Sequence, residues 1–423
     1  MTESFIIDAV RTPIGKLGGA LAGVRPDDLL AETFRAIVGR NSNLDPADID
    51  EIYAGDANGA GEDNRNVARM ASLLAGFPVT VPGATFNRLC GSGMEALLGA
   101  SRTVEVGDAD MVIAGGVESM TRAPWVLLKP AKGYPTSHEQ LWNSALGWRM
   151  VNPQMPQEWT VALGEGAEIL ADKYSITREE QDEFAAGSHR RATDAWANGW
   201  FDREIVPVPG VELPRDECVR PGSTPDTLAV LKPVFRSNGS VTAGNSSPMN
   251  DGAAAMLVTS AAGAERLGAT PLARVAGRGT AGVEPHLFGI GPVEASRLAL
   301  RRAGITWDDL DAVELNEAFA AQSIACLREL PDLDPAKVNS LGGAIAIGHP
   351  LGCSGIRIVT TLTHHLQRTG GRYGLAAMCI GVGQGIAVVI ENLSQTPHRS
   401  KTEATATHDG TSPKISRHLG RVD

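Results

Sequence analysis

The chain has 423 residues, of which 43% are hydrophobic and 21% charged, a balance typical of a globular protein with a large core. Its formal net charge of −11 excludes a general basic surface, so we expect neither a nucleic-acid partner nor a membrane partner. The five cysteines do not suit a secreted disulfide framework, and no apolar run reaches the ~20 residues of a membrane span. The first residues also lack a signal-peptide pattern. Together these features predict a cytoplasmic protein.

The first part of the chain alternates short apolar strands with helices. Its predicted elements are, in chain order, a strand at residues 5–10, a helix opened by Pro26, a helix at 92–106 and a buried strand at 111–116. Proline is favoured in the first turn of a helix, which is why Pro26 marks a helix start.

The middle of the chain, residues 122–239, has a different composition. It contains six of the seven tryptophans, which are Trp125, Trp142, Trp148, Trp159, Trp196 and Trp200. Such a segment either forms the mouth of a site or an oligomer contact, or is a subdomain with its own aromatic core.

The last part of the chain repeats the order of the first. Its predicted elements are a strand at 273–277, a helix opened by Pro292, a strand at 312–315, a helix at 356–368 and strands at 375–378 and 385–390. Asp50 and Asp311, which lie in similar acidic segments ahead of a strand, are 261 positions apart (311 − 50). Ser92-Gly93 and Ser354-Gly355 are 262 positions apart (354 − 92). Two matches at nearly one offset indicate an internal duplication.

This alternation predicts an α/β fold, with mixed sheets covered by helices and arranged in two similar layered units. We expect an N-terminal unit from residues 1–121 and 240–268, a loop or insertion domain at 122–239, and a C-terminal unit at 269–393. Residues 394–423 are polar and contain no aromatic residue, so we expect a disordered tail.

Cys90 lies in the turn Asn87-Arg88-Leu89-Cys90-Gly91-Ser92-Gly93, directly before a predicted helix. A helix N-terminus stabilises a thiolate, and glycine leaves backbone N–H groups free to bind an oxyanion. Two other interpretations stay open. Cys90 could be an inert core residue, or Gly91 to Ala96 could be the Gly-x-Gly-x-x-Ala fingerprint of a nicotinamide-dependent oxidoreductase. That fingerprint requires an acidic residue at the end of the next strand, where this chain has Gly115-Gly116.

Two further Gly-rich turns carry reactive side chains. His349 lies in the turn at residues 342–355, and Cys379 opens the turn Cys379-Ile380-Gly381-Val382-Gly383-Gln384-Gly385. Histidine is the usual proton carrier at neutral pH, and a thiol nucleophile needs a base. Cys379 either packs in the core or carries a second proton, with the N–H of Gly381 turned toward an oxyanion. A zinc site of His349, Cys353 and Cys379 would lack the paired Cys-x-x-Cys spacing, so we expect no metal.

Asn316 follows the predicted strand at 312–315. At a strand end its amide can orient a water or a carbonyl. Asparagine is also a favoured helix N-cap, so that structural role stays open beside the functional one.

Taken together, these turns resemble the thiolase family of acetyl-CoA acetyltransferases and 3-ketoacyl-CoA thiolases over residues 3–392. The resemblance rests on blocks in family order at residues 87–93, 115–120, 242–245, 250–254, 316–319, 342–355 and 379–385. It implies an acyltransferase that cleaves a 3-oxoacyl-CoA with CoA, through an acyl-cysteine, to acetyl-CoA and a shortened acyl-CoA. Coenzyme A is then a substrate, and no cofactor is bound permanently. We also expect a homo-oligomer, either a dimer or a tetramer.

The resemblance implies a role for each residue of the turns. Cys90 becomes acylated, and His349 activates it and helps to hold the thioester oxygen. Cys379 moves a proton at the acetyl-CoA carbon. Asn316 holds a water in one oxyanion hole, and the backbone N–H groups of Cys90 and Gly381 form the other.

The positions at which the family contacts CoA are Arg220 and Ser247. Pro248 follows where many thiolases have glycine, and because proline has no N–H, any main-chain contact at that position is lost.

Two segments, residues 61–70 and 147–153, are similar to the 3-oxoadipyl-CoA thiolases of aromatic-compound breakdown. That substrate ends in a carboxylate, so a basic side chain near the acyl pocket is expected. Arg65, Arg149 and Arg122 are the candidates, and each could equally form an interface salt bridge.

Three other functions stay open. They are a biosynthetic acetoacetyl-CoA thiolase, a decarboxylating condensing enzyme of related fold, and a thiolase-like protein that binds acyl-CoA without turnover. The second cysteine, Cys379, argues against the condensing enzyme. The presence of Cys90, His349, Asn316 and Cys379 together argues against a non-catalytic protein.

Overall fold

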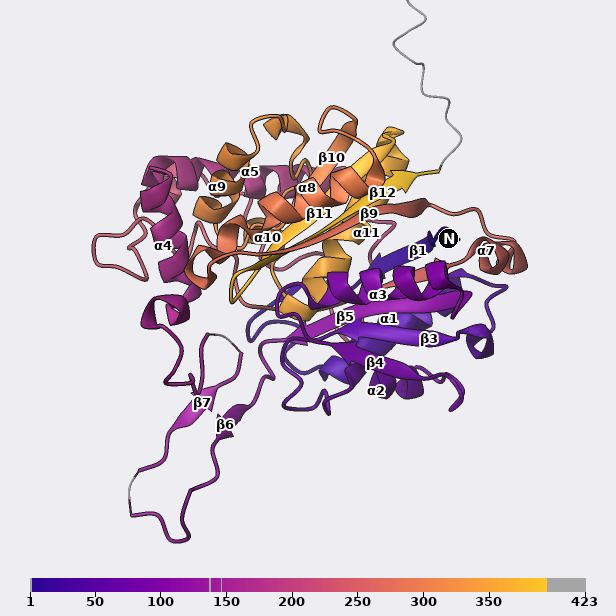
Figure 1. The fold of residues 1–423 in the computed structure, drawn as a ribbon, viewed down its shortest axis with the longest axis horizontal. Helices are drawn as coiled ribbons and strands as arrows, with labels where there is room; N and C mark the ends of the chain where they lie inside the picture. The colour runs from indigo at the N-terminus through magenta and orange to yellow at the C-terminus, as the bar shows by residue number, and fades with distance from the viewer. Residues whose placement is uncertain (1, 137, 146, 394–423) are drawn as a thin grey trace, which may run out of the picture.

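The computed structural model describes residues 2–136, 138–145 and 147–393 (Figure 1). The predicted tail at 394–423 lies outside these described residues. The domain boundaries predicted above stay a prediction, although the elements do fall into two series that flank an insertion.

The N-terminal series begins near the start of the chain and ends after the insertion. Its strands are β1 Phe5–Arg11, β2 Gly15–Lys16, β3 Glu51–Gly55, β4 Gly83–Phe86, β5 Met111–Ser119 and β8 Asn250–Thr259. Its helices are α1 Pro26–Arg40, η1 Pro46–Asp48, α2 Val67–Leu74, α3 Ser92–Val106 and α7 Ala261–Leu267.

The C-terminal series repeats this order. Its strands are β9 Ala273–Gly282, β10 Leu310–Leu315, β11 Tyr373–Ile380 and β12 Gln384–Asn392. Its helices are η3 Pro285–Ile290, α8 Gly291–Ala303, α9 Ala320–Glu329, η4 Pro335–Lys337, α10 Ala344–Ile347 and α11 Leu351–Thr369.

The two series share one mixed ten-stranded sheet, in the order β10-β11-β12-β9-β1-β8-β5-β3-β4, with β2 beside β8. Strand β3 runs parallel to β4 and β5, β10 runs parallel to β11, and the other pairs are antiparallel. The halves join where the first strand of each, β1 and β9, pair through Phe5 with Arg274 and Ile6 with Ala273. The predicted α/β class is confirmed, but the two units meet edge to edge because these first strands satisfy each other's backbone hydrogen bonds.

The matched acids occupy equivalent positions in the two halves. Asp50 Oδ2 accepts the N–H groups of the residue before β5 and of its first residue, at 2.8 and 3.0 Å. Asp311 Oδ2 accepts the corresponding N–H groups at the start of β11, at 2.6 and 3.2 Å. The same bond at the start of the same strand of each half confirms the duplication.

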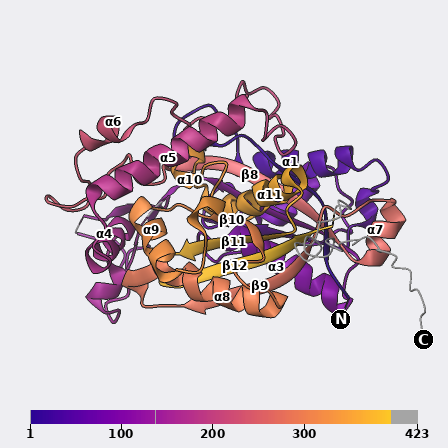
Figure 2. The same cartoon turned by 90° about the horizontal axis from the view of Figure 1, so that it is seen from above.

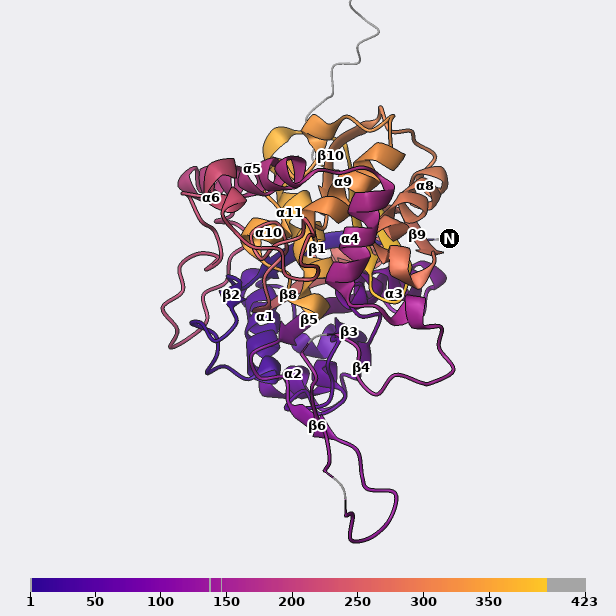
Figure 3. The same ribbon diagram turned by 90° about the vertical axis from the view of Figure 1, so that its left-hand side faces the viewer.

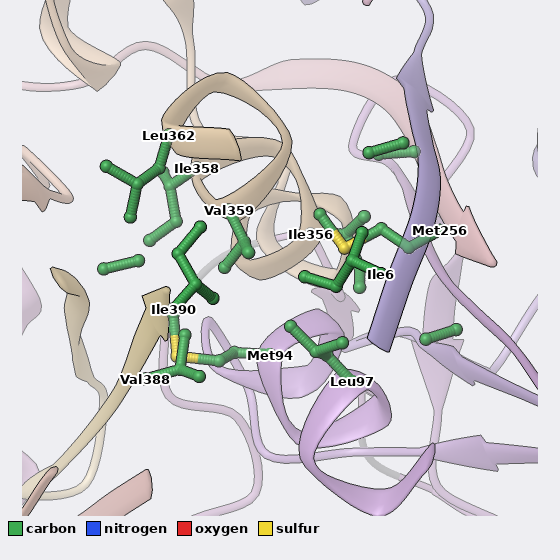
Figure 4. Packing of buried hydrophobic residues seen from close by; sticks show 14 of the residues in the cluster. Ile6, Met94, Leu97, Met256, Ile356, Ile358, Val359, Leu362, Val388 and Ile390 are labelled. Carbon is green, nitrogen blue, oxygen red and sulfur yellow. The ribbon is translucent and has the colours of Figure 1, made fainter. Parts of the chain in front are cut away.

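Helices α3 and α11 lie between the two halves of the sheet (Figures 1 and 3). Figure 4 shows Met94 and Leu97 of α3 close to Ile356 of α11, with Met256 on one side and Val388 on the other. The outer face of the N-terminal half is covered by α1 and α2, and that of the C-terminal half by α8. Strands β1, β5, β8, β11 and β12 are therefore buried on both faces, which explains their nearly continuous apolar sequences.

The N-termini of α3 and α11 approach each other closely. A Cβ atom on Gly93 would lie 2.5 Å from the carbonyl oxygen of Gly352, and one on Gly355 would lie 2.1 Å from the backbone nitrogen of Met94. The glycines after Cys90 therefore allow two helices to meet. They do not leave room for a pyrophosphate, which argues against the dinucleotide-binding interpretation.

The insertion contains β6 Trp125–Leu127, β7 Leu141–Asn143, η2 Gln157–Thr160, α4 Leu163–Lys173, α5 Arg178–Ala197 and α6 Pro225–Ala229. The hairpin of β6 and β7 projects from the body (Figures 1 and 3), and Trp125 on it is 68% exposed. Helix α5 runs beside α10 and α6 (Figure 2), and Trp196 and Trp200 pack against the main core. Of the two alternatives for this segment, the separate aromatic core does not fit these two tryptophans, which pack against the main core. None of the helices in the described part of the chain is both long and apolar enough to cross a membrane.

Candidate active site

Cys90 lies in the tight turn that joins β4 to α3. Leu89 has a left-handed backbone with φ of 48°, and the hydroxyl of Ser92 fixes the turn by accepting the N–H of Arg88 at 2.9 Å and donating to the carbonyl of Leu89 at 2.6 Å. This places Cys90, 7% exposed, in the wall of a cavity of about 360 Å³. The backbone N–H groups of Gly381 and of Cys90 itself donate to the Cys90 thiol.

The protonation state of Cys90 differs from that expected of a cysteine at a helix start. Burial raises the pKa of the thiol to about 11, and the two backbone N–H groups offset only part of that effect. The N-cap of α3 is Gly91, so Cys90 lies just outside the first helical turn. At neutral pH the group is therefore a thiol, and a base must remove its proton during attack.

His349 is held so that one ring nitrogen is free to act as that base. Its Nδ1 lies 2.7 Å from the hydroxyl of Ser354, which donates its own hydrogen to the carbonyl of Pro350 at 2.8 Å. The hydroxyl therefore accepts from Nδ1–H, which leaves a lone pair on Nε2. Burial, and secondarily the charge of Arg357, lowers the pKa of His349 to about 3, so the ring is neutral. Nε2 faces Asn316, whose Nδ2 is 3.5 Å away.

Asn316 extends directly from β10, and its N–H donates to the carbonyl of Ala377 at 2.9 Å. Helix α9 begins after its N-cap Phe319, so the alternative role of Asn316 as that N-cap is wrong. The side chain is buried, and its Oδ1 has no hydrogen-bond partner among the described residues. A buried amide oxygen next to His349 is an acceptor available to a water or a substrate group.

Cys379 is the second-last residue of β11 and is 1% exposed. Burial raises its pKa well above the ordinary value, and the neighbouring thiol of Cys90 raises it further. The turn that follows contains Val382 and Gly383, both with a left-handed backbone. The structure thus brings Cys90, Cys379 and the N–H of Gly381 together from turns almost three hundred residues apart in the chain.

The described residues contain no group of three or more histidine, cysteine, aspartate or glutamate side chains arranged to hold a metal ion. The site as built consists of a thiol, a neutral imidazole, an amide, a second thiol and two backbone donors. This is a set suited to covalent acyl transfer.

Three residues that support the site were not predicted. Ser354 orients His349, and Asn250 Oδ1 accepts the backbone N–H of His349 at 2.9 Å. Glu118 Oε2 accepts the N–H groups of Ala57 and Gly352, at 3.0 and 2.9 Å, and so ties the cavity wall to the start of α11. The duplication contained a signal for Ser354, because its counterpart Ser92 likewise donates its hydroxyl to a backbone carbonyl of the preceding turn.

Neither of the two expected CoA-contacting residues is among the residues that line this cavity. Arg220 lines a separate hollow with Lys16 and Pro248. Ser247 is half-buried, and its N–H donates to the carbonyl of Ala318 at 3.0 Å.

The three candidate arginines have different surroundings. Arg149 lines the cavity of Cys90. Arg122 lines another hollow and is ion-paired with Glu62, while Arg65 is exposed.

The comparisons with known proteins decide the family. The thiolase N-terminal domain matches residues 4–262, and the thiolase C-terminal domain matches residues 269–392. The chain belongs to the thiolase family. It is therefore an acyltransferase, as predicted, and not a nicotinamide-dependent oxidoreductase.

This thiolase has relatives that align along nearly their whole length. The chain is 52% identical over 403 residues to a beta-ketoadipyl-CoA thiolase of Escherichia coli, covering 93% of this chain and 100% of the relative. It is 51% identical over 399 residues to the protein of that name in Pseudomonas aeruginosa, covering 92% and 99%. Among solved structures, the Bacillus anthracis acetyl-CoA acetyltransferase superposes with a TM-score of 0.87 at 42% identity, covering 93% and 99%. Human mitochondrial 3-ketoacyl-CoA thiolase in complex with CoA also gives 0.87, at 38% identity, covering 92% and 98%.

The raised pKa of Cys90 predicts how the rate of its alkylation depends on pH. Because the pKa of Cys90 is raised to about 11, its thiolate fraction grows about tenfold with each pH unit below that value. We expect the rate of Cys90 carboxamidomethylation by iodoacetamide to rise steadily between about pH 6.5 and 9. Quantifying the modified Cys90 peptide by mass spectrometry, with Cys90→Ser as the background, measures this. A rate that stays constant from acid to neutral pH would instead indicate a preformed thiolate–imidazolium pair.

Proposed function

We propose that this thiolase cleaves 3-oxoadipyl-CoA with CoA to acetyl-CoA and a four-carbon dicarboxylic acyl-CoA. The carrying observation is the cavity lined by Cys90, Leu351 and Gly381, one residue from each of the three Gly-rich turns, with the thiol of Cys379 next to that of Cys90. The choice of substrate is supported by relatives of about half identity that are named beta-ketoadipyl-CoA thiolases.

In the first half-reaction the Cys90 proton moves to Nε2 of His349, and the sulfur attacks the C3 carbonyl of the substrate. The N–H groups of Cys90 and Gly381 donate to the oxygen that becomes negatively charged. The C2–C3 bond then breaks, and acetyl-CoA leaves as an enolate. His349, now protonated at Nε2, and a water held by Asn316 stabilise the enolate oxygen, while Cys379 gives its proton to the enolate carbon.

In the second half-reaction CoA enters and loses its thiol proton to the Cys379 thiolate. The CoA sulfur attacks the acyl carbon, the Cys90 thiolate leaves, and His349 returns its proton. Every group ends in its starting state. Dividing one carbon–carbon cleavage into two acyl transfers lowers the barrier of each.

Arg220 and Ser247 are proposed to contact CoA. The hollow of Arg220 also contains Lys16 and Glu217, which form an ion pair at 3.4 Å, so Arg220 is the cation that suits a phosphate of the nucleotide end. No cofactor is required beyond CoA as a substrate. Measuring the KM for CoA in Arg220→Gln tests the contact, and an unchanged KM would argue against it.

We further propose a cytoplasmic homo-oligomer, a dimer or a tetramer. The projecting hairpin has large exposed apolar residues, including Trp125, Leu127 and Leu141, and exposed apolar patches commonly form protein contacts. Sedimentation velocity reports the oligomeric state directly, and a monomer at micromolar concentration would contradict the proposal.

The substrate proposal is tested by thiolysis rates on matched substrates. 3-Oxoadipyl-CoA and 3-oxohexanoyl-CoA have six acyl carbons each and differ in whether the chain ends in a carboxylate or a methyl group. We expect kcat/KM to be at least about tenfold higher for 3-oxoadipyl-CoA, because a charged hydrogen bond contributes about 1.5–3 kcal/mol. Acetoacetyl-CoA and a long 3-oxoacyl-CoA complete the series. Equal or faster turnover of the neutral six-carbon substrate would reject the substrate and leave the family unaffected.

A further inference from the structure

The cavity that contains Cys90 has a mainly apolar lining with a single charged side chain. Its described lining residues are Ala57, Asn58, Leu89, Cys90, Ser144, Ala145, Gly147, Trp148, Arg149, Leu163, Leu351, Gly381 and Val382. Of these, Arg149 alone is charged. A guanidinium facing an apolar cavity favours binding an anion, since desolvating a charge without a partner is costly.

The position of Arg149 is fixed by hydrogen bonds that leave most of its donors free. Its Nη1 donates to the carbonyl of Ser144 at 3.1 Å, and the Ser144 hydroxyl accepts from Asn58 Nδ2 at 2.9 Å. The indole N–H of the neighbouring Trp148 donates to the carbonyl of Val161 at 3.0 Å. Within the described ranges no acidic side chain forms an ion pair with Arg149. One donor of the guanidinium is therefore used, and the remainder of its planar fork is available to a carboxylate.

The other two candidate arginines do not present free guanidinium donors to the cavity. Arg122 donates to both carboxylate oxygens of Glu62, at 2.5 and 2.7 Å, and to the carbonyl of Ala22. Its charge is thus already paired. Arg65 is exposed and does not line the cavity.

Burial reduces the negative charge of the acids behind this wall. Asp56 directly precedes the lining residues Ala57 and Asn58. Burial, together with the charges of Glu118 and Asp63, raises the pKa of Asp56, so its carboxyl is protonated at neutral pH. Glu118, whose Oε2 accepts the N–H of Ala57, also lies behind this wall, and burial raises its pKa to about 7. Arg149 is therefore the charged side chain that faces the cavity itself.

We propose that Arg149 binds the terminal carboxylate of the acyl chain and is the residue that selects dicarboxylic 3-oxoacyl-CoA substrates over neutral ones. This inference rests on the proposed function, because it identifies the residue behind the substrate preference. The guanidinium binds the carboxylate through its free donors, in the same cavity in which Cys90 attacks the C3 carbonyl. Arg149 takes no part in breaking or forming bonds.

The test compares kcat/KM for 3-oxoadipyl-CoA with that for 3-oxohexanoyl-CoA in the wild type and in three variants. Both substrates have the same CoA, so any contact of Arg149 with CoA affects both equally and cancels in the ratio. We expect Arg149→Gln to lower the ratio by about 10- to 100-fold, the range of a charged hydrogen bond. Arg149→Lys retains the charge but not the fork and should recover part of the ratio. The matched control Arg65→Gln removes an exposed arginine that does not line the cavity and should leave the ratio at the wild-type value.

The outcomes separate this inference from the substrate proposal. A wild type that prefers 3-oxoadipyl-CoA, with an unchanged ratio in Arg149→Gln, overturns the role of Arg149 and leaves the substrate intact. A wild type without the preference rejects the substrate itself. An equal loss on both substrates in Arg149→Gln shows a structural or CoA contact and also overturns the inference. The melting temperature shows whether Arg149→Gln folds. If it does not fold, Arg149→Met replaces it, because methionine keeps an apolar side chain without the charge. The same ratio of kcat/KM for the two substrates then tests the inference.

Discussion

Acetyl-CoA incubated with this thiolase will place a single acetyl group on Cys90, and Cys90→Ser will lose thiolysis by about 10³-fold or more. Cys90 is the thiol that lines the substrate cavity and receives the N–H groups of Gly381 and of its own backbone. A serine hydroxyl is a far weaker nucleophile, and the neutral His349 is too weak a base to ionise it efficiently. Peptide mass spectrometry locates the acetyl group, and initial rates with a 3-oxoacyl-CoA measure the loss.

The control is a cysteine of similar burial that lies outside the cavity. Cys353 is fully buried in the central core. Cys353→Ala should keep both the label on Cys90 and most of the thiolysis activity, with a modest loss of stability from the smaller side chain. An acetyl group found on Cys353 or Cys379 would contradict the assignment of the nucleophile.

Much of the fold could be predicted because strand and helix signals agree locally with the tertiary structure. The helix after Cys90 was predicted at residues 92–106 and is α3 Ser92–Val106, since a Gly-rich turn precedes it and Gly107 ends it with a left-handed φ of 85°. The helix predicted at 356–368 instead begins at Leu351. Glycine normally disfavours a helix, but a Cβ on Gly352 would lie 2.2 Å from the carbonyl of Val117, so close packing requires glycine inside this helix.

The site could be predicted only in part. Each Gly-rich turn indicated a reactive residue, but spacing alone does not show that turns so far apart in the chain meet in one cavity, and their grouping came from the resemblance to thiolases. The raised pKa of Cys90 depends on burial, which the local sequence of a helix start does not reveal. Likewise Arg122 and Arg149 look equivalent until the ion pair with Glu62 is seen. The catalytic roles stay predictions until variants are measured.

Replacing Cys379 by serine will separate the two kinds of chemistry at the site. Acylation of Cys90 from acetyl-CoA needs the nucleophile and His349 as its base, and without Cys379 the leaving CoA thiolate can take its proton from water. Cleavage of the C2–C3 bond needs, in addition, an acid for the enolate carbon, and the raised pKa of Cys379 keeps that thiol protonated and ready to donate. A serine hydroxyl is a much weaker acid, so we expect thiolysis of a 3-oxoacyl-CoA to fall by about 10²–10⁴-fold, the usual contribution of general acid–base catalysis.

The same variant should still accept an acetyl group on Cys90, while exchange of the acetyl-CoA methyl hydrogens with D₂O is lost, because that exchange requires Cys379 to remove and return a proton at carbon. The matched control is Cys326→Ser. Cys326 is a second fully buried cysteine near Cys379, and it donates to the carbonyl of Gly289 at 3.1 Å, a bond that serine can also form. Its thiolysis and exchange rates should therefore stay close to those of the wild type. Full thiolysis activity in Cys379→Ser would remove Cys379 from the mechanism. If acylation were lost together with cleavage, Cys379 would be needed to build the site and not to move a proton, since a missing carbon acid alone leaves the acyl transfer to Cys90 intact.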